Sequence, residues 1–146
     1  MKKWAILLVI TITMLALVGC GGSSSAENEQ AQSLSDNYGI STPMTISKNN
    51  TDNWIKFEVS DTRANDPSKY AFDLVNAYRE HNGEEVGLIW VINYANNTTT
   101  CINPQSPIIV TQHDYVKDEQ FDCKAIGSGT VLAEYFIDSE TGEVIE

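Results

Sequence analysis

Residues 86–94 read VGLIWVINY, and the middle of this run is apolar on both of the faces that a β-strand presents. Alternate side chains of an extended chain point to opposite sides. Leu88, Trp90 and Ile92 therefore share one side, and Ile89 and Val91 share the other. A strand with one face in water would carry polar residues at alternate positions. The run predicts a central strand that is buried on both faces.

The segment before this strand predicts another strand and a helix. Residues 54–59 alternate apolar and polar side chains, which is typical of a half-buried strand. Asp66-Pro67 is a favourable helix start, because the carboxylate accepts free amides of the first turn and proline needs no hydrogen bond there. The helix is expected to end at Asn82-Gly83, where glycine can adopt the left-handed conformation of a C-terminal cap.

After the central strand, short turns separate segments that favour strands. These predicted strands cover residues 98–102, 108–111, 119–126, 131–137 and 143–145. Their connections are too short to contain crossover helices, so consecutive strands should pair antiparallel. We predict an α+β domain, a two-layer sandwich in which one helix packs on an antiparallel sheet of about five to six strands.

The N-terminus carries an export signal. Two lysines precede an apolar run over residues 4–18, which suits the core of a signal peptide but is short for a membrane-spanning helix. The run closes with Leu17-Val18-Gly19-Cys20, which resembles the lipobox of bacterial lipoprotein precursors. That resemblance implies cleavage before Cys20 and attachment of lipid, such as palmitate, to the new N-terminal residue. The alternative is ordinary secretory cleavage near Gly19 with an incidental cysteine.

These signals predict three parts of the chain: a signal peptide over residues 1–19, a lipidated flexible tether over residues 20–45, and a single α+β domain over residues 46–146. The tether is expected from the glycine, serine and other polar residues that follow Cys20. Two acyl chains anchor a protein stably where one chain is marginal. We therefore expect a lipid-anchored protein on the extracytoplasmic face of the cell membrane.

The composition limits the class of partner. The chain has 20 acidic and 9 basic side chains, for a formal net charge of −11, and its exported part loses two lysines with the signal. Such a surface repels phosphate backbones, so we expect no nucleic-acid partner. The sequence contains no GxSxG, HExxH, SxxK or phosphate-cradling glycine motif. We therefore expect no cofactor and no metal.

Four oxygen-bearing side chains before the predicted helix are a weaker candidate for calcium. They are Asp52, Asp61, Asn65 and Asp66. Their spacing does not match the twelve-residue calcium loop with its central glycine and closing glutamate. Capping and turn formation are the simpler interpretation of these residues.

The exported part contains two further cysteines, Cys101 and Cys123. An even pair in an oxidising compartment favours a disulfide bond. Neither cysteine has a nearby CxxC or CxxH partner, which argues against zinc or redox chemistry. The alternative is two free buried thiols.

His113-Asp114-Tyr115 combines an imidazole, a carboxylate and a phenol. A base held by an acid near a phenol is suited to acid–base chemistry. Adjacent residues on a strand point to opposite faces, however, so His113 and Asp114 should diverge. We therefore favour a structural or recognition role, with these three residues as a possible binding site and no catalytic residue assigned.

The region from Asp61 to Glu146 resembles a functionally uncharacterised domain found at the C-terminal end of bacterial membrane-anchored proteins and lipoproteins. The resemblance rests on short matches in order along the chain: Asp61, Arg63, Asp66, Asn93-Tyr94, Asn97-Thr98-Thr99-Thr100, His113-Asp114-Tyr115-Val116, Glu134-Tyr135 and Thr141-Gly142-Glu143. It implies a location and a fold shape, but no activity. That domain has no cysteine at the positions of Cys101 and Cys123.

Two functional hypotheses follow from these observations. The favoured one is a non-enzymatic, membrane-anchored binding or accessory module that meets a surface protein, a peptide or a wall component. The alternative is a small secreted hydrolase that uses His113 with an acidic partner from a distant segment. The hydrolase requires His113 in a concave pocket within hydrogen-bond reach of a carboxylate or nucleophile.

Overall fold

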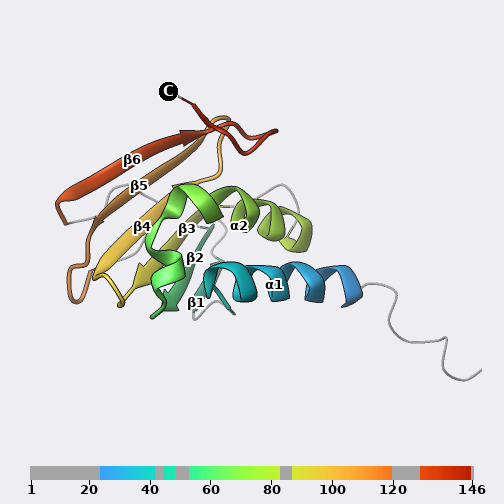
Figure 1. Cartoon of the computed structure of the whole chain (residues 1–146), viewed down its shortest axis with the longest axis horizontal. Coiled ribbons are helices and arrows are strands. Elements are labelled where there is room, and N and C mark those ends of the chain that lie inside the picture. Colours follow the sequence, from blue (N-terminus) through green and yellow to red (C-terminus); the bar gives the residue numbers. More distant parts are fainter. Residues whose placement is uncertain (1–23, 42–44, 49–52, 83–86, 120–128, 146) are drawn as a thin grey trace, which may run out of the picture.

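The computed structural model describes residues 24–41, 45–48, 53–82, 87–119 and 129–145. Two helices, α1 (Ser24–Tyr38) and α2 (Pro67–Asn82), lie against one face of a sheet (Figure 1). A short 3-10 helix, η1 (Thr62–Asn65), precedes α2. The strands are β1 (Thr45–Lys48), β2 (Asn53–Val59), β3 (Leu88–Asn93), β4 (Thr98–Asn103), β5 (Ile108–Asp114), β6 (Val131–Ile137) and β7 (Val144–Ile145).

The sheet has seven strands, and their order in space is their order along the chain. Every neighbouring pair is antiparallel except β2 and β3, which run parallel. The parallel pair arises because η1 and α2 carry the chain back between β2 and β3, as a crossover connection does. The predicted α+β two-layer class is confirmed, and the structure adds a second helix and this one parallel pair.

The main core lies between the helices and the sheet. Apolar residues of β2 and β3 face the apolar side of α2, and the buried set includes Ile55, Phe57, Val59, Ile89, Val91, Tyr70, Ala71, Leu74 and Val75. The α2 residues recur at three- and four-residue spacing, which places them on one side of the helix. The start of α2 is the predicted one, since the Asp66 carboxylate accepts the Ser68 amide at 3.1 Å.

A smaller apolar cluster lies on the opposite face of the sheet. It consists of Leu88, Trp90 and Cys101, with Trp54 packed against it. All six residues of β3 are buried. The prediction that this strand is central and covered on both faces is therefore confirmed.

Helix α1 lies within the segment predicted as a flexible tether, and the tether prediction does not hold for it. Leu34 and Ile40 are buried in the main core. The Tyr38 hydroxyl donates to the Asp73 carboxylate at 2.8 Å. The Arg63 guanidinium donates to the backbone oxygen of Asp36. Helix α1 therefore belongs to the packed domain.

The chain turns sharply at Gly39, just after the end of α1. Gly39 has φ +66°, a conformation that glycine adopts without steric cost, and its amide donates to the Ser35 carbonyl at 2.9 Å. A Cβ atom at position 39 would lie 2.4 Å from Oδ2 of Asp61. The chain therefore turns tightly here, and the next residue, Ile40, enters the core.

Several sequence predictions fall outside the described residues, among them the signal peptide, the lipidation at Cys20 and the calcium candidate Asp52. Residues 120–126 of the strand predicted over 119–126 are among them, and so is Cys123. The bond between Cys101 and Cys123 stays a prediction, with Cys101 buried on β4. No helix in the described part of the chain is long and apolar enough to cross a bilayer.

Candidate functional site

His113 lies near the end of β5, on the sheet face opposite the helices. It pairs in register with Thr99 of β4, and only 1% of its surface is exposed. Its Nε2 lies 3.1 Å from Oε1 and 3.3 Å from Oε2 of Glu119. The ring of Trp90 packs edge-to-face against the imidazole, with centroids 6.2 Å apart. Glu119 is thus an acidic partner that sequence reasoning missed, because it stands six residues further on, beyond the end of the strand.

The contact with Glu119 uses Nε2 of the imidazole, so Nδ1 is the other ring nitrogen to account for. A carboxylate accepts hydrogen bonds, so Nε2 is the nitrogen that carries a proton in this pair. Among the described residues, neither the buried Nδ1 of His113 nor the buried Oγ1 of Thr99 has a hydrogen-bond partner. Buried polar atoms nearly always have a partner, so two such atoms at paired strand positions are unusual. We name His113, Glu119 and Thr99 the histidine site.

The histidine site contains parts used in catalysis, but its side chains are buried. A carboxylate-bonded imidazole beside a hydroxyl is a combination found in acid–base and nucleophilic chemistry. Here the side chains of His113 and Glu119 are only 1% and 2% exposed, and Thr99 is fully buried. A depression on α1 and another between α1 and α2 include no member of the histidine site. In the described part of the chain this site is enclosed by protein.

The other two residues of the predicted cluster lie in different surroundings. Asp114 is exposed, and its amide donates to the Thr130 carbonyl at 3.0 Å. Tyr115 packs edge-to-face against Tyr94 at 5.5 Å. The Tyr94 hydroxyl donates to the Glu58 carboxylate at 3.1 Å, and burial together with this carboxylate raises the pKa of Tyr94 to about 12. The structure pairs His113 with Glu119 instead of Asp114, so the three predicted residues do not form one site.

Asn93, which belongs to the resemblance described above, has a structural role. Its side-chain oxygen accepts the amides of Asp61 and Ala95, at 3.4 and 3.0 Å. Its side-chain nitrogen donates to the Asp61 carbonyl and to Oδ1 of Asn65, at 2.9 and 3.0 Å. The amide is buried and uses both its donors and its acceptor, which ties the end of β3 to η1.

The oxygen ligands considered for calcium are already engaged in the fold. Asp61 binds Arg63 with a 2.6 Å contact, and hydrogen bonds from Arg63 lower the pKa of Asp61 to about 2. Asp66 caps α2, Asn65 binds Asn93, and Asp52 lies outside the described residues. Among the residues that the structure describes, no group of three or more histidine, cysteine, aspartate or glutamate side chains is placed to hold a metal ion.

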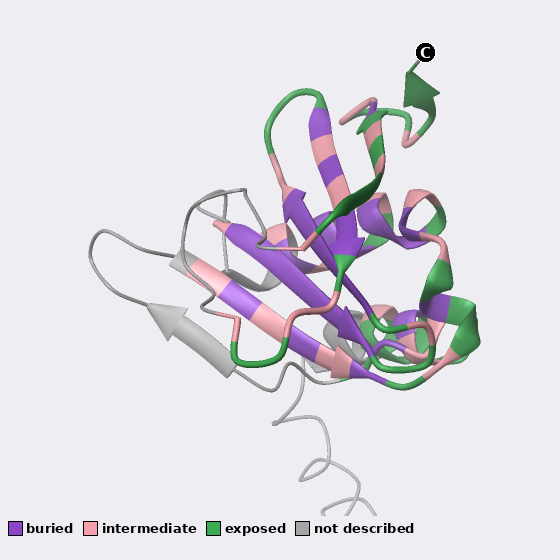
Figure 2. Ribbon diagram, turned by 90° about the vertical axis from the view of Figure 1, so that its left-hand side faces the viewer, coloured by how far each residue is buried: buried purple, intermediate pink, exposed green. Residues whose placement is uncertain are grey.

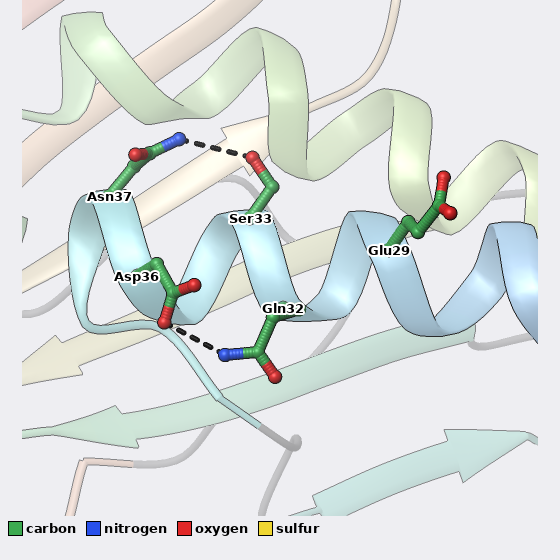
Figure 3. Close-up of a pocket in the computed structure, with 5 residues that line it drawn as sticks. All are labelled: Glu29, Gln32, Ser33, Asp36 and Asn37. Carbon is green, nitrogen blue, oxygen red and sulfur yellow. Dashed lines mark hydrogen bonds between the residues drawn. The ribbon is translucent and has the colours of Figure 1, made fainter.

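One surface depression lies on α1 and is lined by polar residues (Figure 3). Its lining side chains all come from this helix and largely bind one another. Gln32 donates to Asp36 at 2.8 Å, and Asn37 donates to Ser33 at 3.0 Å, while Glu29 lies two turns away from Asn37 (Figure 3). The Ser33 hydroxyl and the Asp36 carboxylate each bind a different neighbour on the helix, so we assign no chemistry to this depression.

The last two strands expose an apolar surface that sequence reasoning also missed. Five large side chains of β6 and β7 are between 40% and 60% exposed: Val131, Leu132, Phe136, Val144 and Ile145. We name these five residues the edge patch. Figure 2 shows β7 and much of β6 coloured as exposed, in contrast to the buried central strands. The one hint in the sequence is that the last predicted strand is very short. A two-residue strand such as β7 cannot cover the whole of β6.

Comparisons with protein-family models, with curated proteins and with solved structures give no match to this chain. The residues and their geometry are therefore the basis of the function proposed below.

Proposed function

We propose that the protein is a non-enzymatic binding or accessory lipoprotein that meets its partner through the edge patch. The proposed location is the extracytoplasmic face of the cell membrane, with a lipid anchor at Cys20. The lipobox-like sequence before Cys20 supports the anchor. The observation that carries the binding role is the exposure of five large apolar side chains on the last two strands.

The edge patch has the character of a contact surface. Isolated exposed apolar residues are common in proteins, whereas an edge strand that exposes several of them is a place where another chain can add or aggregate. Burying apolar surface contributes roughly 25 cal/mol per Å², so a partner that covers these side chains gains binding free energy. A surface protein, a peptide or a wall component can supply such a cover.

The enclosed histidine site also supports a non-enzymatic role. A catalytic base has to reach its substrate within hydrogen-bond distance. His113, Glu119 and Thr99 instead sit beneath the surface with Trp90 packed on the imidazole. The contact between His113 and Glu119 more closely resembles a structural one, which holds the segment after β5 against the sheet.

Site-specific photo-crosslinking in intact cells tests the binding role. A benzophenone side chain placed at Phe136 is expected to form a covalent adduct of defined mass, because this position lies in the edge patch. The same group at Gln32, which is exposed on α1, is the matched control and should form none. Adducts at both positions, or at neither, would contradict a recognition role for the edge patch.

The second candidate function is a small secreted hydrolase, and the 3.1 Å contact between His113 and Glu119 favours it. We expect no turnover when the wild-type protein is screened against esters, peptides and glycans. His113→Ala should lower the free energy of unfolding by about 1–3 kcal/mol, because it removes a buried hydrogen-bonded group. Wild-type turnover that disappears in a normally melting His113→Ala protein would establish the hydrolase instead.

A further inference from the structure

Strand β6 has an open backbone edge over most of its length. It pairs with β5 from Val131 to Ile137, but with β7 only at Phe136 and Ile137. In the described part of the chain, residues 131–135 therefore lack a partner strand on their outer side. Unpaired amide and carbonyl groups along such an edge are a template for an added strand.

The side chains of this edge favour an extended partner with regularly spaced apolar residues. Val131, Leu132 and Phe136 are 60%, 51% and 40% exposed. A strand added to β6 would place its alternate side chains on each face of the sheet. Val131, Glu134 and Phe136 pair with His113, Thr111 and Ile109, so they share one face of the sheet. The partner face that meets them therefore needs apolar residues together with a basic one.

The charge around this edge is of one sign. Residues 129–145 contain Glu134, Asp138, Glu140 and Glu143, and no lysine, arginine or histidine. Glu134, Glu140 and Glu143 are exposed, and Glu134 lies on β6 itself. Opposite charges across an interface attract a partner and select it, whereas like charges repel. A basic partner therefore fits this surface, and a second copy of a chain with net charge −11 fits it poorly.

We propose that β6 binds an extended polypeptide segment that presents lysine or arginine beside apolar residues on one face, and that this segment adds to the sheet as a strand. The proposal rests on the proposed binding function and names the chemistry of its partner. Main-chain hydrogen bonds to residues 131–135 would supply affinity. The acidic side chains and the exposed apolar side chains would supply selectivity.

A peptide-binding experiment tests this proposal directly. The full lipid-anchored protein is placed in phosphatidylcholine nanodiscs, which carry no net charge that would attract a basic peptide. The probe is a fluorescent octapeptide in which every second residue is lysine or valine in turn and the residues between them are threonine, and its binding is followed by anisotropy. We expect binding that slows amide hydrogen exchange at residues 131–135, because those amides become hydrogen-bonded to the peptide.

Two control peptides separate strand addition from general attraction between charges. Replacing lysine by glutamate in the probe should abolish binding. Methylating alternate backbone nitrogens of the lysine–valine probe preserves its charge but prevents pairing, so binding should again be lost. Equal binding of the methylated and unmethylated probes would overturn strand addition.

Protein variants locate the site. Glu134→Gln is expected to weaken binding by about two- to fivefold, the effect of one exposed charge pair. Glu29→Gln removes an exposed charge from α1 and should leave the affinity unchanged. Equal weakening by the two substitutions would show that only net charge matters, and it would overturn the proposal.

The remaining outcomes distinguish this inference from the proposed function. Slow exchange at residues 131–135 before peptide is added would mean that this chain or a second copy already covers the edge, and sedimentation would tell which. Either result overturns the inference. A specific photo-adduct at Phe136 without peptide binding would also overturn it, and would leave the proposed binding function standing.

Discussion

Cys20→Ala is expected to release the protein from the membrane fraction or to leave the signal peptide uncleaved. The lipobox-like sequence over residues 17–20 follows directly after the apolar run, so Cys20 is the expected acceptor of lipid. Each buried acyl methylene contributes about 0.8 kcal/mol, and without the acyl chains the acidic protein has no comparable attraction to a bilayer. Cell fractionation and mass spectrometry of the N-terminus measure both effects.

Ser23→Ala is the matched control, because it changes a nearby small residue without removing the thiol. It should leave the protein on the membrane with a lipidated N-terminus. An unmodified N-terminus at a residue other than Cys20, in protein that still sediments with membranes, would contradict lipid anchoring at this position.

The parts of the fold that could be predicted are those with strong local signals. The central strand β3 is apolar at consecutive positions, and only a strand covered on both faces suits that pattern. Helix α2 begins where Asp66 and Pro67 supply its cap, and it ends at Asn82 as its sequence indicates. These signals lie within a few residues of the elements that they specify.

Helix α1 could not be predicted because its support comes from distant residues. Its sequence is polar apart from a few positions, and Leu34 is the residue within it that enters the core. The contacts that hold it join Asp36 to Arg63 and Tyr38 to Asp73, across long separations in the chain. A composition rich in glutamine, serine and asparagine is typical of both a linker and such a docked helix.

The histidine site was predicted only in part for a similar reason. Alternation along β5 correctly separates His113 from Asp114, since the structure places them in different surroundings. The true partner, Glu119, reaches back to His113 from beyond the end of the strand. Its position depends on how the chain turns after β5, which no pairwise spacing in the sequence specifies.

The edge patch was missed because its pattern is ambiguous in isolation. Residues 131–137 are apolar or aromatic apart from Glu134, which predicts a strand but not what covers it. The structure places this strand next to the two-residue strand β7, so Phe136 and neighbouring apolar side chains remain exposed. The sequence indicates a strand, but the place of the strand within the sheet decides whether anything covers its side chains.

Trp90→Ala is expected to lower the free energy of unfolding by about 3–5 kcal/mol, the usual cost of removing a large buried aromatic side chain. Trp90 is 1% exposed, packs with Leu88 and Cys101, and contacts the His113 ring. A domain of this size is stable by about 5–15 kcal/mol, so the variant should be marginally folded. Urea unfolding followed by circular dichroism measures the loss. Trp54→Ala, which removes a half-buried tryptophan from the same cluster, is the control and should lower the free energy of unfolding by clearly less. Equal losses for the two variants would mean that Trp90 is not the main residue of this smaller apolar cluster.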